Sequence, residues 1–382
     1  MSDFAVLALD ALVKSLLIIF TLLTGFAYTT LLERRFIALI QQRVGPNRAG
    51  PFGFLQPVAD GVKLFFKEDI MPAAADKVFF TLAPVITAVP ALIVLAPVPV
   101  GPTVRINIPA LNIDHTTSLV LVSTDVDMLW VLGVTTVAVY GIVLAGWASN
   151  NKYATLGGMR STAQMISYEL ALGISAFIPV FLAGSLNFST IVEAQSDLWF
   201  AFVPVVGQVA AVIFYITVLA ETNRAPFDLP EAEQELTAGY HSEYSGMKFA
   251  AFFMAEYMKM IAMSAVFATL FLGGFRLGIP FVPEGIEVPW LFTEDVGRLH
   301  TWFGGWFAPA ILGGKVIGSL MVFIWIRATL PRLRYDRLMD FGWKSLLPIS
   351  FAALVYTVIL VALDISVFWF VDLAQWLVSL FM

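Results

Sequence analysis

The chain has 382 residues, of which 59% are hydrophobic and only 13% are charged. Soluble domains carry about 25% charged residues, so this composition excludes an ordinary soluble protein and indicates a membrane protein. The net charge of −6 argues against nucleic acid as a partner, and the absence of cysteine excludes disulfides, thiolate metal sites and iron–sulfur ligation by this chain.

Eight segments are apolar enough and long enough to cross a bilayer, which takes about 20 residues. They predict transmembrane helices over 11–32, 76–97, 128–148, 161–184, 199–220, 248–272, 307–328 and 345–370. We find no soluble domain, so residues 1–382 are expected to form a single membrane domain. The predicted fold class is all-α, a polytopic helix bundle with about eight transmembrane helices. The first segment follows acidic residues rather than basic ones, which is typical of a retained helix and not of a signal peptide.

The loop 33–75 contains the amphipathic stretch FLQPVADGVKLFFK at 54–67. On a helix, its apolar residues fall within about 120° of one face, while polar and charged residues share the opposite face. The stretch is too short to span a membrane. Two interpretations remain open, namely a helix lying at the membrane interface and a lid that packs on the bundle without binding a ligand.

Basic residues are distributed very unevenly between the two sets of loops. Sixteen of the 22 Lys and Arg residues lie in one set, four lie in the alternating set, and Lys259 and Lys315 lie within predicted helices. Because cytoplasmic loops carry the excess of basic residues, the loops 33–75 and 221–247 are predicted to be cytoplasmic and both termini to be outside.

Several charged residues fall within the predicted helices, where charge is costly and usually marks an ion path or a substrate site. Glu256 and Lys259 are spaced i,i+3, so they could pair with each other. A functional interpretation is favoured for Glu169 and for this pair. For Lys315 and Asp364 a structural ion pair or a snorkelling side chain is favoured instead.

The loop 221–247 begins with ETNRAPFDLPEAEQEL, which holds five acidic residues and one arginine. Glu231 and Glu235 share a helical face, and carboxylates this close are expected to include some with a raised pKa that hold and pass protons. The alternative is a solvated acidic loop. The interleaved apolar residues, such as Phe227, favour a partly apolar vestibule in a protein that moves protons or ions.

Three long motifs closely resemble those of one family, the quinone-site membrane subunit of respiratory complex I, which is NADH-quinone oxidoreductase. They are LLERRFIALIQQRVGPNRAGPFGFLQPVADGVKLFFKED (31–69), GWASNNKYATLGGMRSTAQMISYELALG (146–173) and ETNRAPFDLPEAEQELTAGYHSEYSGMKFAAFFMAEY (221–257). Together they cover about a quarter of the chain, in the order the family shows. The outside loops 98–127 and 273–306 match no family motif, which leaves accessory contacts there in doubt.

The resemblance implies a membrane subunit that forms part of a quinone tunnel and links quinone reduction to proton translocation. It implies quinone-binding roles for Arg34, Asp60, Phe227 and Asp228. It implies roles in proton transfer for Tyr168, Glu169, Glu221, Glu231, Glu233, Glu235, Glu243, Glu256 and Tyr257. Arg224 and Lys259 are expected to balance the neighbouring acids.

The resemblance also implies quinone as the substrate, with flavin and iron–sulfur clusters on other subunits. The expected partners are the peripheral-arm subunits, including the one with the terminal iron–sulfur cluster, the other membrane-arm subunits and the lipid bilayer. The expected location is a bacterial plasma membrane. Two alternatives stay open, a homologous membrane subunit of an energy-converting hydrogenase-type complex and a stand-alone ion-coupled transporter.

Overall fold

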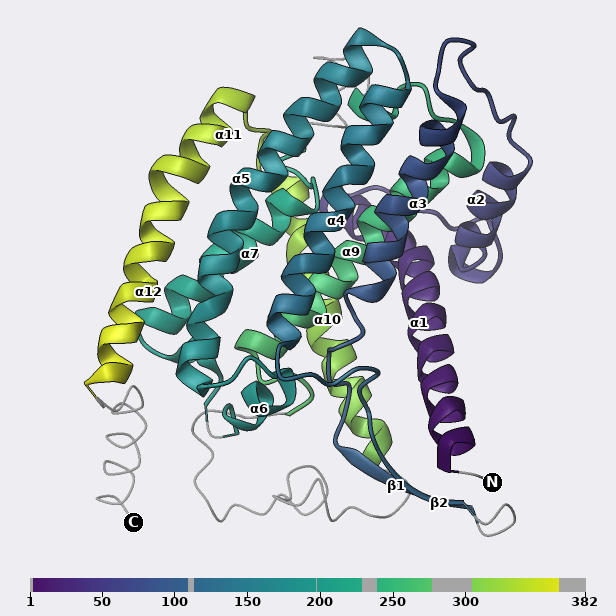
Figure 1. The fold of residues 1–382 in the computed structure, drawn as a ribbon. Coiled ribbons are helices and arrows are strands. Elements are labelled where there is room, and N and C mark those ends of the chain that lie inside the picture. The colour runs from purple at the N-terminus through teal and green to yellow at the C-terminus, as the bar shows by residue number, and fades with distance from the viewer. Residues whose placement is uncertain (1–2, 109–112, 197, 229–238, 277–303, 364–382) are drawn as a thin grey trace.

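The computed structural model describes residues 3–108, 113–196, 198–228, 239–276 and 304–363. The long helices run side by side in one bundle (Figure 1), as the polytopic helical prediction requires. Within the described residues, six helices are long and apolar enough to cross a membrane. They are α1 (Asp3–Ile40), α4 (Asp127–Ala148), α5 (Lys152–Ala183), α9 (Gly246–Phe271), α10 (Gly304–Thr329) and the continuous helix formed by α11 (Tyr335–Phe341), the π-helical turn Gly342–Leu346 and α12 (Leu347–Ala362).

Two shorter apolar helices, α3 (Lys77–Ile93) and α7 (Val206–Glu221), occupy the other two predicted segments. Each predicted segment therefore contains an apolar helix, but several ends were misplaced. α1 continues to Ile40, α5 begins at Lys152 and the last helix begins at Tyr335. Hydropathy marks the part of a helix that lies in hydrocarbon, whereas the hydrogen-bonded helix continues into the polar region until its backbone is capped.

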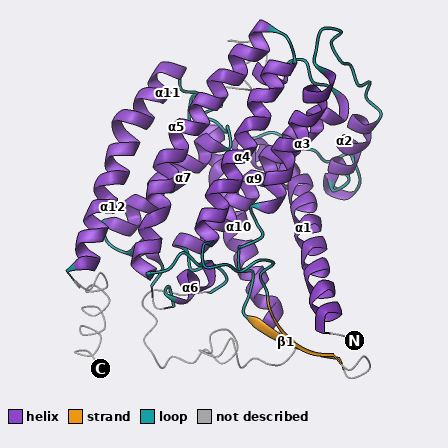
Figure 2. Cartoon of the chain, in the orientation of Figure 1, coloured by secondary structure: helices purple, strands orange, loops and turns teal. Residues whose placement is uncertain are grey.

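Short elements gather at the two ends of the bundle (Figure 1). α2 (Gln56–Phe65) lies at the end where α4 turns into α5 and where α11 begins. α6 (Phe188–Glu193) and a β-hairpin lie at the other end, where α1 and α10 begin (Figure 2). Short 3₁₀ turns occur at Pro51–Gly53, Phe200–Phe202 and Gly239–His241. Ser245 Oγ donates to the Glu68 carbonyl at 2.8 Å, so the segments 33–75 and 221–247 meet, and the charge pattern predicted that they lie on the same side.

The hairpin is the main departure from an all-α reading. Strands β1 (Thr103–Ile108) and β2 (Ile113–Ser118) pair antiparallel within the loop 98–127, with Thr103 opposite Ser118. Hydropathy over about 20 residues does not detect a pair of six-residue strands, because the strand signal has a period of two. The fold is nonetheless a helical membrane bundle.

The structure favours one of the two interpretations of the amphipathic stretch. No residue of α2 is buried, and the side chains of Val58, Val62, Phe65 and Phe66 are 52–80% exposed. A lid would bury this apolar face against the bundle. An uncovered apolar face on a short helix beside a membrane bundle is typical of a helix that lies at the interface.

Small residues allow α3 and α4 to approach closely. A Cβ added to Gly141 on α4 would lie 2.1 Å from Thr87 Oγ1 and 2.9 Å from the Ala83 carbonyl oxygen on α3. Such contacts hold membrane helices together through packing rather than through the hydrophobic effect. The buried core extends from here through α5, α7 and α9.

Replacing Gly141 with alanine is expected to push α3 and α4 apart and to cost about 1–3 kcal/mol, as overpacking of a core does. Gly133 is the matched control, because it lies on the same helix and an added Cβ there meets no atom within 4 Å. The thermal stability of the purified membrane protein should fall for Gly141→Ala and not for Gly133→Ala. Equal stabilities would contradict the close packing of α3 on α4.

Candidate functional site

Arg34 and Asp60, both predicted on the quinone side, are brought together by the structure. Arg34 Nη1 donates to Asp60 Oδ2 at 2.7 Å, which ties α2 to α1. Gln56 Nε2 donates to the other carboxylate oxygen at 3.3 Å. This pair is only partly buried. An open hollow of about 170 Å³ lies in the adjoining segment and is lined by Arg35, Val44, Gly45, Pro46, Asn47 and Phe52.

Phe227 and Asp228 lie elsewhere, beside α5 and α11. The Phe227 ring is buried between Tyr168, with ring centroids 5.3 Å apart, and Phe341, at 6.5 Å. The Asp228 carboxylate is buried and accepts from Arg332 Nη2 at 3.1 Å. Both residues therefore have strong packing or charge partners of their own, in a place different from the Arg34–Asp60 pair.

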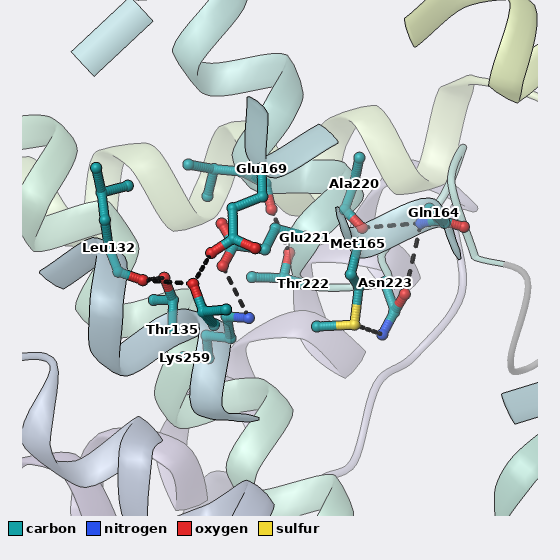
Figure 3. Close-up of polar contacts among 12 residues, drawn as sticks. Leu132, Thr135, Gln164, Met165, Glu169, Ala220, Glu221, Thr222, Asn223 and Lys259 are labelled. Carbon is teal, nitrogen blue, oxygen red and sulfur yellow. Dashed lines mark hydrogen bonds and ion pairs between the residues drawn. The ribbon is translucent and has the colours of Figure 1, made fainter. Parts of the chain in front are cut away.

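The segment that follows α7 is held by one buried side chain. Gln164 on α5 donates from Nε2 to the Ala220 carbonyl at 2.8 Å and to the Phe227 carbonyl at 2.7 Å. Asn223 adopts a left-handed conformation with φ of 50°, which ends the helix, and asparagine tolerates that conformation well. Figure 3 shows Gln164 reaching toward Ala220 and Asn223. The beginning of the acidic loop is thus fixed against α5.

A buried cluster at α1, α9 and α10 includes an acid that the sequence analysis missed. Glu33 is 5% exposed, accepts a hydrogen bond from the Tyr257 hydroxyl at 2.5 Å and forms an ion pair with Arg327. The Arg224 guanidinium lies over the Tyr257 ring, 4.1 Å from its centroid. Glu33 stands directly before Arg34 and Arg35 in the sequence, at the first residue of the predicted loop 33–75. Its position at the end of the first predicted span was the available signal.

Lys259 has a different partner from the one that its sequence spacing suggested. Its Nζ lies 2.9 Å from Glu221 Oε1, across from α9 to α7, and both side chains are almost wholly buried. The expected i,i+3 pairing with Glu256 is therefore not the one observed. Helix packing decides this, because α7 brings a carboxylate to the face of α9 that carries Lys259. Figure 3 shows Lys259 and Glu221 meeting beside Glu169.

Glu256 lies beside this pair and has its own hydrogen-bond donor. The Tyr240 hydroxyl donates to Glu256 Oε1 at 3.1 Å. These groups line a small cavity of about 20 Å³, whose lining includes Glu221, Glu256, Lys259, Tyr240 and Thr222. A cavity of this size has room for roughly one water molecule, next to the polar atoms of these side chains.

Tyr168 and Glu169 are adjacent in sequence, but their side chains lie on different faces of α5 and contact different helices. The Tyr168 hydroxyl is buried and donates to the Leu338 carbonyl at 2.8 Å. The Glu169 carboxylate accepts a hydrogen bond from Thr136 on α4 and points toward Glu221 and Lys259 in Figure 3. Thr136 is exposed and Glu169 is half-buried, so this carboxylate can be reached from the surface formed by α4 and α5.

The described part of the acidic loop adds Glu243, which accepts from Asn151 Nδ2 at 2.6 Å. The neighbouring Tyr244 ring stacks on Phe80 with centroids 4.0 Å apart, and burial raises the pKa of its hydroxyl. Tyr244 therefore stays protonated at neutral pH. Glu231, Glu233 and Glu235 lie outside the described residues, and their predicted roles stay predictions.

Lys315 has structural partners, as favoured from the sequence, although these partners are not acids. Its Nζ donates to the carbonyls of Leu272 at 2.5 Å, Gly274 at 2.8 Å and Arg276 at 2.5 Å. A cation at this place stabilises the carboxyl end of α9, where backbone carbonyls are otherwise unpaired. Asp364 lies outside the described residues. Among the described residues, no group of three or more His, Cys, Asp and Glu side chains could hold a metal ion.

The paired intramembrane carboxylates and the α1–α2 junction coincide with the three sequence motifs. The sequence profile of the NADH dehydrogenase family matches residues 13–358. The chain belongs to the NADH dehydrogenase family. This confirms the resemblance stated from the motifs.

Curated relatives in this family agree. A protein of Rhodothermus marinus named NADH-quinone oxidoreductase subunit 8 is 46% identical over 94% of this chain and 97% of its own length. A protein of Geobacter metallireducens, also named as a subunit of NADH-quinone oxidoreductase, is 44% identical over 91% of this chain and 94% of its own. A third relative with such a name, from Streptomyces avermitilis, is 46% identical over 88% of this chain and 70% of its own. As a member of this family, the chain is a multi-pass membrane subunit of an oxidoreductase complex.

Proposed function

We propose that the chain forms the membrane part of a quinone-binding site and links quinone reduction to proton movement through its intramembrane carboxylates. The relatives act, by their names, as subunits of NADH-quinone oxidoreductase. NADH oxidation, flavin and iron–sulfur clusters belong to partner subunits of the peripheral arm. This assignment agrees with a chain that has no cysteine.

The observation that carries the proposal is a series of carboxylates, each with its own partner, inside the bundle. Glu33 meets Tyr257 and Arg327, Glu256 meets Tyr240, Glu221 meets Lys259, and Glu169 meets Thr136. The carboxylates come from different helices of the bundle, namely α1, α5, α7 and α9. A purely structural bundle has little reason to keep so many ionisable groups in hydrocarbon, where each one costs several kcal/mol unless it is paired.

Glu33 and Glu169 stand at the two ends of this series of carboxylates. Glu33 lies near the proposed quinone site, and Glu169 lies where protons could pass to another subunit. Glu33 directly precedes Arg34, whose ion pair with Asp60 joins α1 to the interfacial helix α2. Glu169 is reached from the surface of α4 and α5, where a neighbouring membrane subunit would contact it. Reduction of a quinone takes up two electrons and two protons. Protons drawn from nearby groups leave those groups negatively charged, which biases the protonation of the neighbouring acids.

The quinone half of the proposal predicts the effect of Asp60→Asn. Loss of the carboxylate frees Arg34 and loosens α2, so the apparent KM for a soluble quinone should rise about threefold or more, which corresponds to roughly 0.7 kcal/mol. NADH oxidation by ferricyanide should not change. Asp69→Asn is the control, because Asp69 pairs with Lys248 at 2.9 Å in the same cytoplasmic segment. Normal quinone kinetics for Asp60→Asn would show that the Arg34–Asp60 pair has no role in binding quinone.

The family also leaves room for a hydrogenase-type complex, and one experiment separates the two. The tagged chain is isolated from native membranes in mild detergent, and the eluate is assayed for NADH–quinone activity with and without a quinone-site inhibitor. Inhibitor-sensitive activity, together with flavin and iron–sulfur signals, supports the proposal. Hydrogenase or ferredoxin activity without quinone reduction would favour the alternative.

The proposed orientation places α2 and the acidic loop in the cytoplasm of a bacterial cell and both termini outside. It rests on the excess of basic residues in the loops at the α2 end of the bundle. The chain has no native cysteine, so single cysteines placed at Gln41 and Asp125 can be labelled with an impermeant reagent. Labelling of Gln41→Cys from outside the cell would reverse the orientation.

A further inference from the structure

Lys259 lies between two carboxylates that come from different helices. Glu221 on α7 holds its ammonium group at 2.9 Å. Glu256 lies one turn earlier on α9, on the same face as Lys259, because residues three apart on a helix are neighbours. All three side chains line the cavity of about 20 Å³. Lys259, Glu221 and Glu256 therefore line the same water-sized cavity, and Lys259 forms its ion pair with Glu221.

The pair is buried but its hydrogen bonds are incomplete. Lys259 is 6% exposed and Glu221 is 2% exposed. Glu221 Oε2 is buried without any hydrogen-bond partner among the described residues. A fixed buried ion pair is stable when further hydrogen bonds satisfy both groups. A carboxylate that lacks a hydrogen-bond donor at one oxygen, beside a water-sized cavity, is suited to receive a proton, because the protonated form needs fewer donors around it.

We propose that Lys259 is a charge switch whose ammonium group moves from Glu221 to Glu256 when a proton moves in the opposite direction. This inference rests on the proposed function and deepens it. In the observed state Glu221 is ionised and paired with Lys259, and Glu256 carries the proton. In the second state Glu221 carries the proton and Glu256 is ionised and paired with Lys259.

The step is balanced. The Glu256 carboxylic acid gives up its proton and becomes a carboxylate, and the Glu221 carboxylate accepts that proton and becomes an acid. One water molecule in the cavity is enough to relay it. Lys259 stays protonated throughout and only changes partner. Among Lys259, Glu221 and Glu256, each state holds one cation and one anion, which pair with each other, so neither state leaves an unpaired charge on these three groups.

The residues on either side of Lys259 give the proton transfer a direction, from Glu256 through Glu221 toward Glu169. Glu256 already accepts from the Tyr240 hydroxyl, which can support it in either protonation state. Glu169 points toward Glu221 on the other side, so a proton on Glu221 faces the next acid (Figure 3). Lys259 is a positioning residue in this scheme, because it selects which acid is ionised and does not itself carry the transferred proton.

The test is the double variant Lys259→Met/Glu221→Gln in the whole complex. It removes both charges at once, so no unpaired charge is left to disturb folding. Lys259→Gln/Glu221→Gln is a second version, in which two amides keep a hydrogen bond between α7 and α9. We expect either variant to assemble with wild-type flavin content, while proton translocation in vesicles falls at least about tenfold, within the range that loss of a positioned acid or base produces.

The control is Lys248→Met, which removes a lysine from the beginning of the same helix, where it pairs with Asp69 and not with any of the carboxylates of the series. It should translocate protons as the wild type does. Wild-type translocation by either assembled double variant would overturn the switch, because it would show that the pair serves only to join α7 and α9. If Glu169→Gln still abolished translocation in that case, the proposed function would stand and only the switch would fail. If Glu169→Gln and Asp60→Asn were also without effect, the proposed function itself would fail.

Discussion

Replacing Glu169 with glutamine is expected to abolish most proton translocation while leaving the complex assembled. The Glu169 carboxylate lies midway along α5, accepts from Thr136 and points toward the Glu221–Lys259 pair. Glutamine has the same shape, keeps an oxygen to accept from Thr136 and brings no charge into the bundle. The substitution therefore removes the exchangeable proton and little else.

The expected decrease in proton translocation is at least about tenfold, since a missing acid or base in a transfer step costs about 10²–10⁴ in rate. Translocation is measured in vesicles as the pH change on addition of NADH, and assembly as flavin content. The matched control is Glu193→Gln, because Glu193 is an exposed residue that ends α6 at the hairpin end of the bundle. Wild-type proton translocation by Glu169→Gln would show that Glu169 does not transfer protons.

Replacing Arg327 with methionine is expected to destabilise the protein more than any single change at its surface. Arg327 on α10 pairs with Glu33 on α1, and the Glu33 side chain is only 7% exposed. Without the guanidinium, the buried carboxylate depends on the hydrogen bond from the Tyr257 hydroxyl and must either stay ionised at high cost or take up a proton. The cost should be about 1–3 kcal/mol, because Arg327 itself is partly exposed.

A second substitution tests the cause of that loss. In Arg327→Met/Glu33→Gln the buried charge is gone, so much of the lost stability should return, and the two effects should be strongly non-additive. The measurement is the half-life of the isolated complex at a raised temperature, which should shorten about fivefold or more for Arg327→Met alone. Additive losses in the double variant would show that Arg327 and Glu33 do not act as a pair. Quinone reduction should also fall in Arg327→Met, since Glu33 directly precedes the Arg34–Asp60 junction.

Much of the candidate site could be named from the sequence because the motifs are long and ungapped. The motifs imply a quinone-side position for Arg34 and Asp60, and the structure pairs these two side chains at 2.7 Å. Glu33 was missed, although it precedes Arg34, because its burial depends on α9 and α10, which are more than 200 residues away. Phe227 and Asp228 share a motif with the acids, yet they pack on α5, Phe341 and Arg332.

The sequence by itself determined the membrane class, the eight apolar segments, the amphipathic helix and the family. These properties depend on composition, on hydropathy over about 20 residues and on periodicity, all of which are local along the chain. Only the tertiary structure decided which acid meets which base. Spacing on α9 offered Lys259 the neighbouring Glu256, but the packing of α7 against α9 presents Glu221 instead. One face of a helix can carry several charged side chains. How the neighbouring helices pack against that face decides which of these side chains form ion pairs.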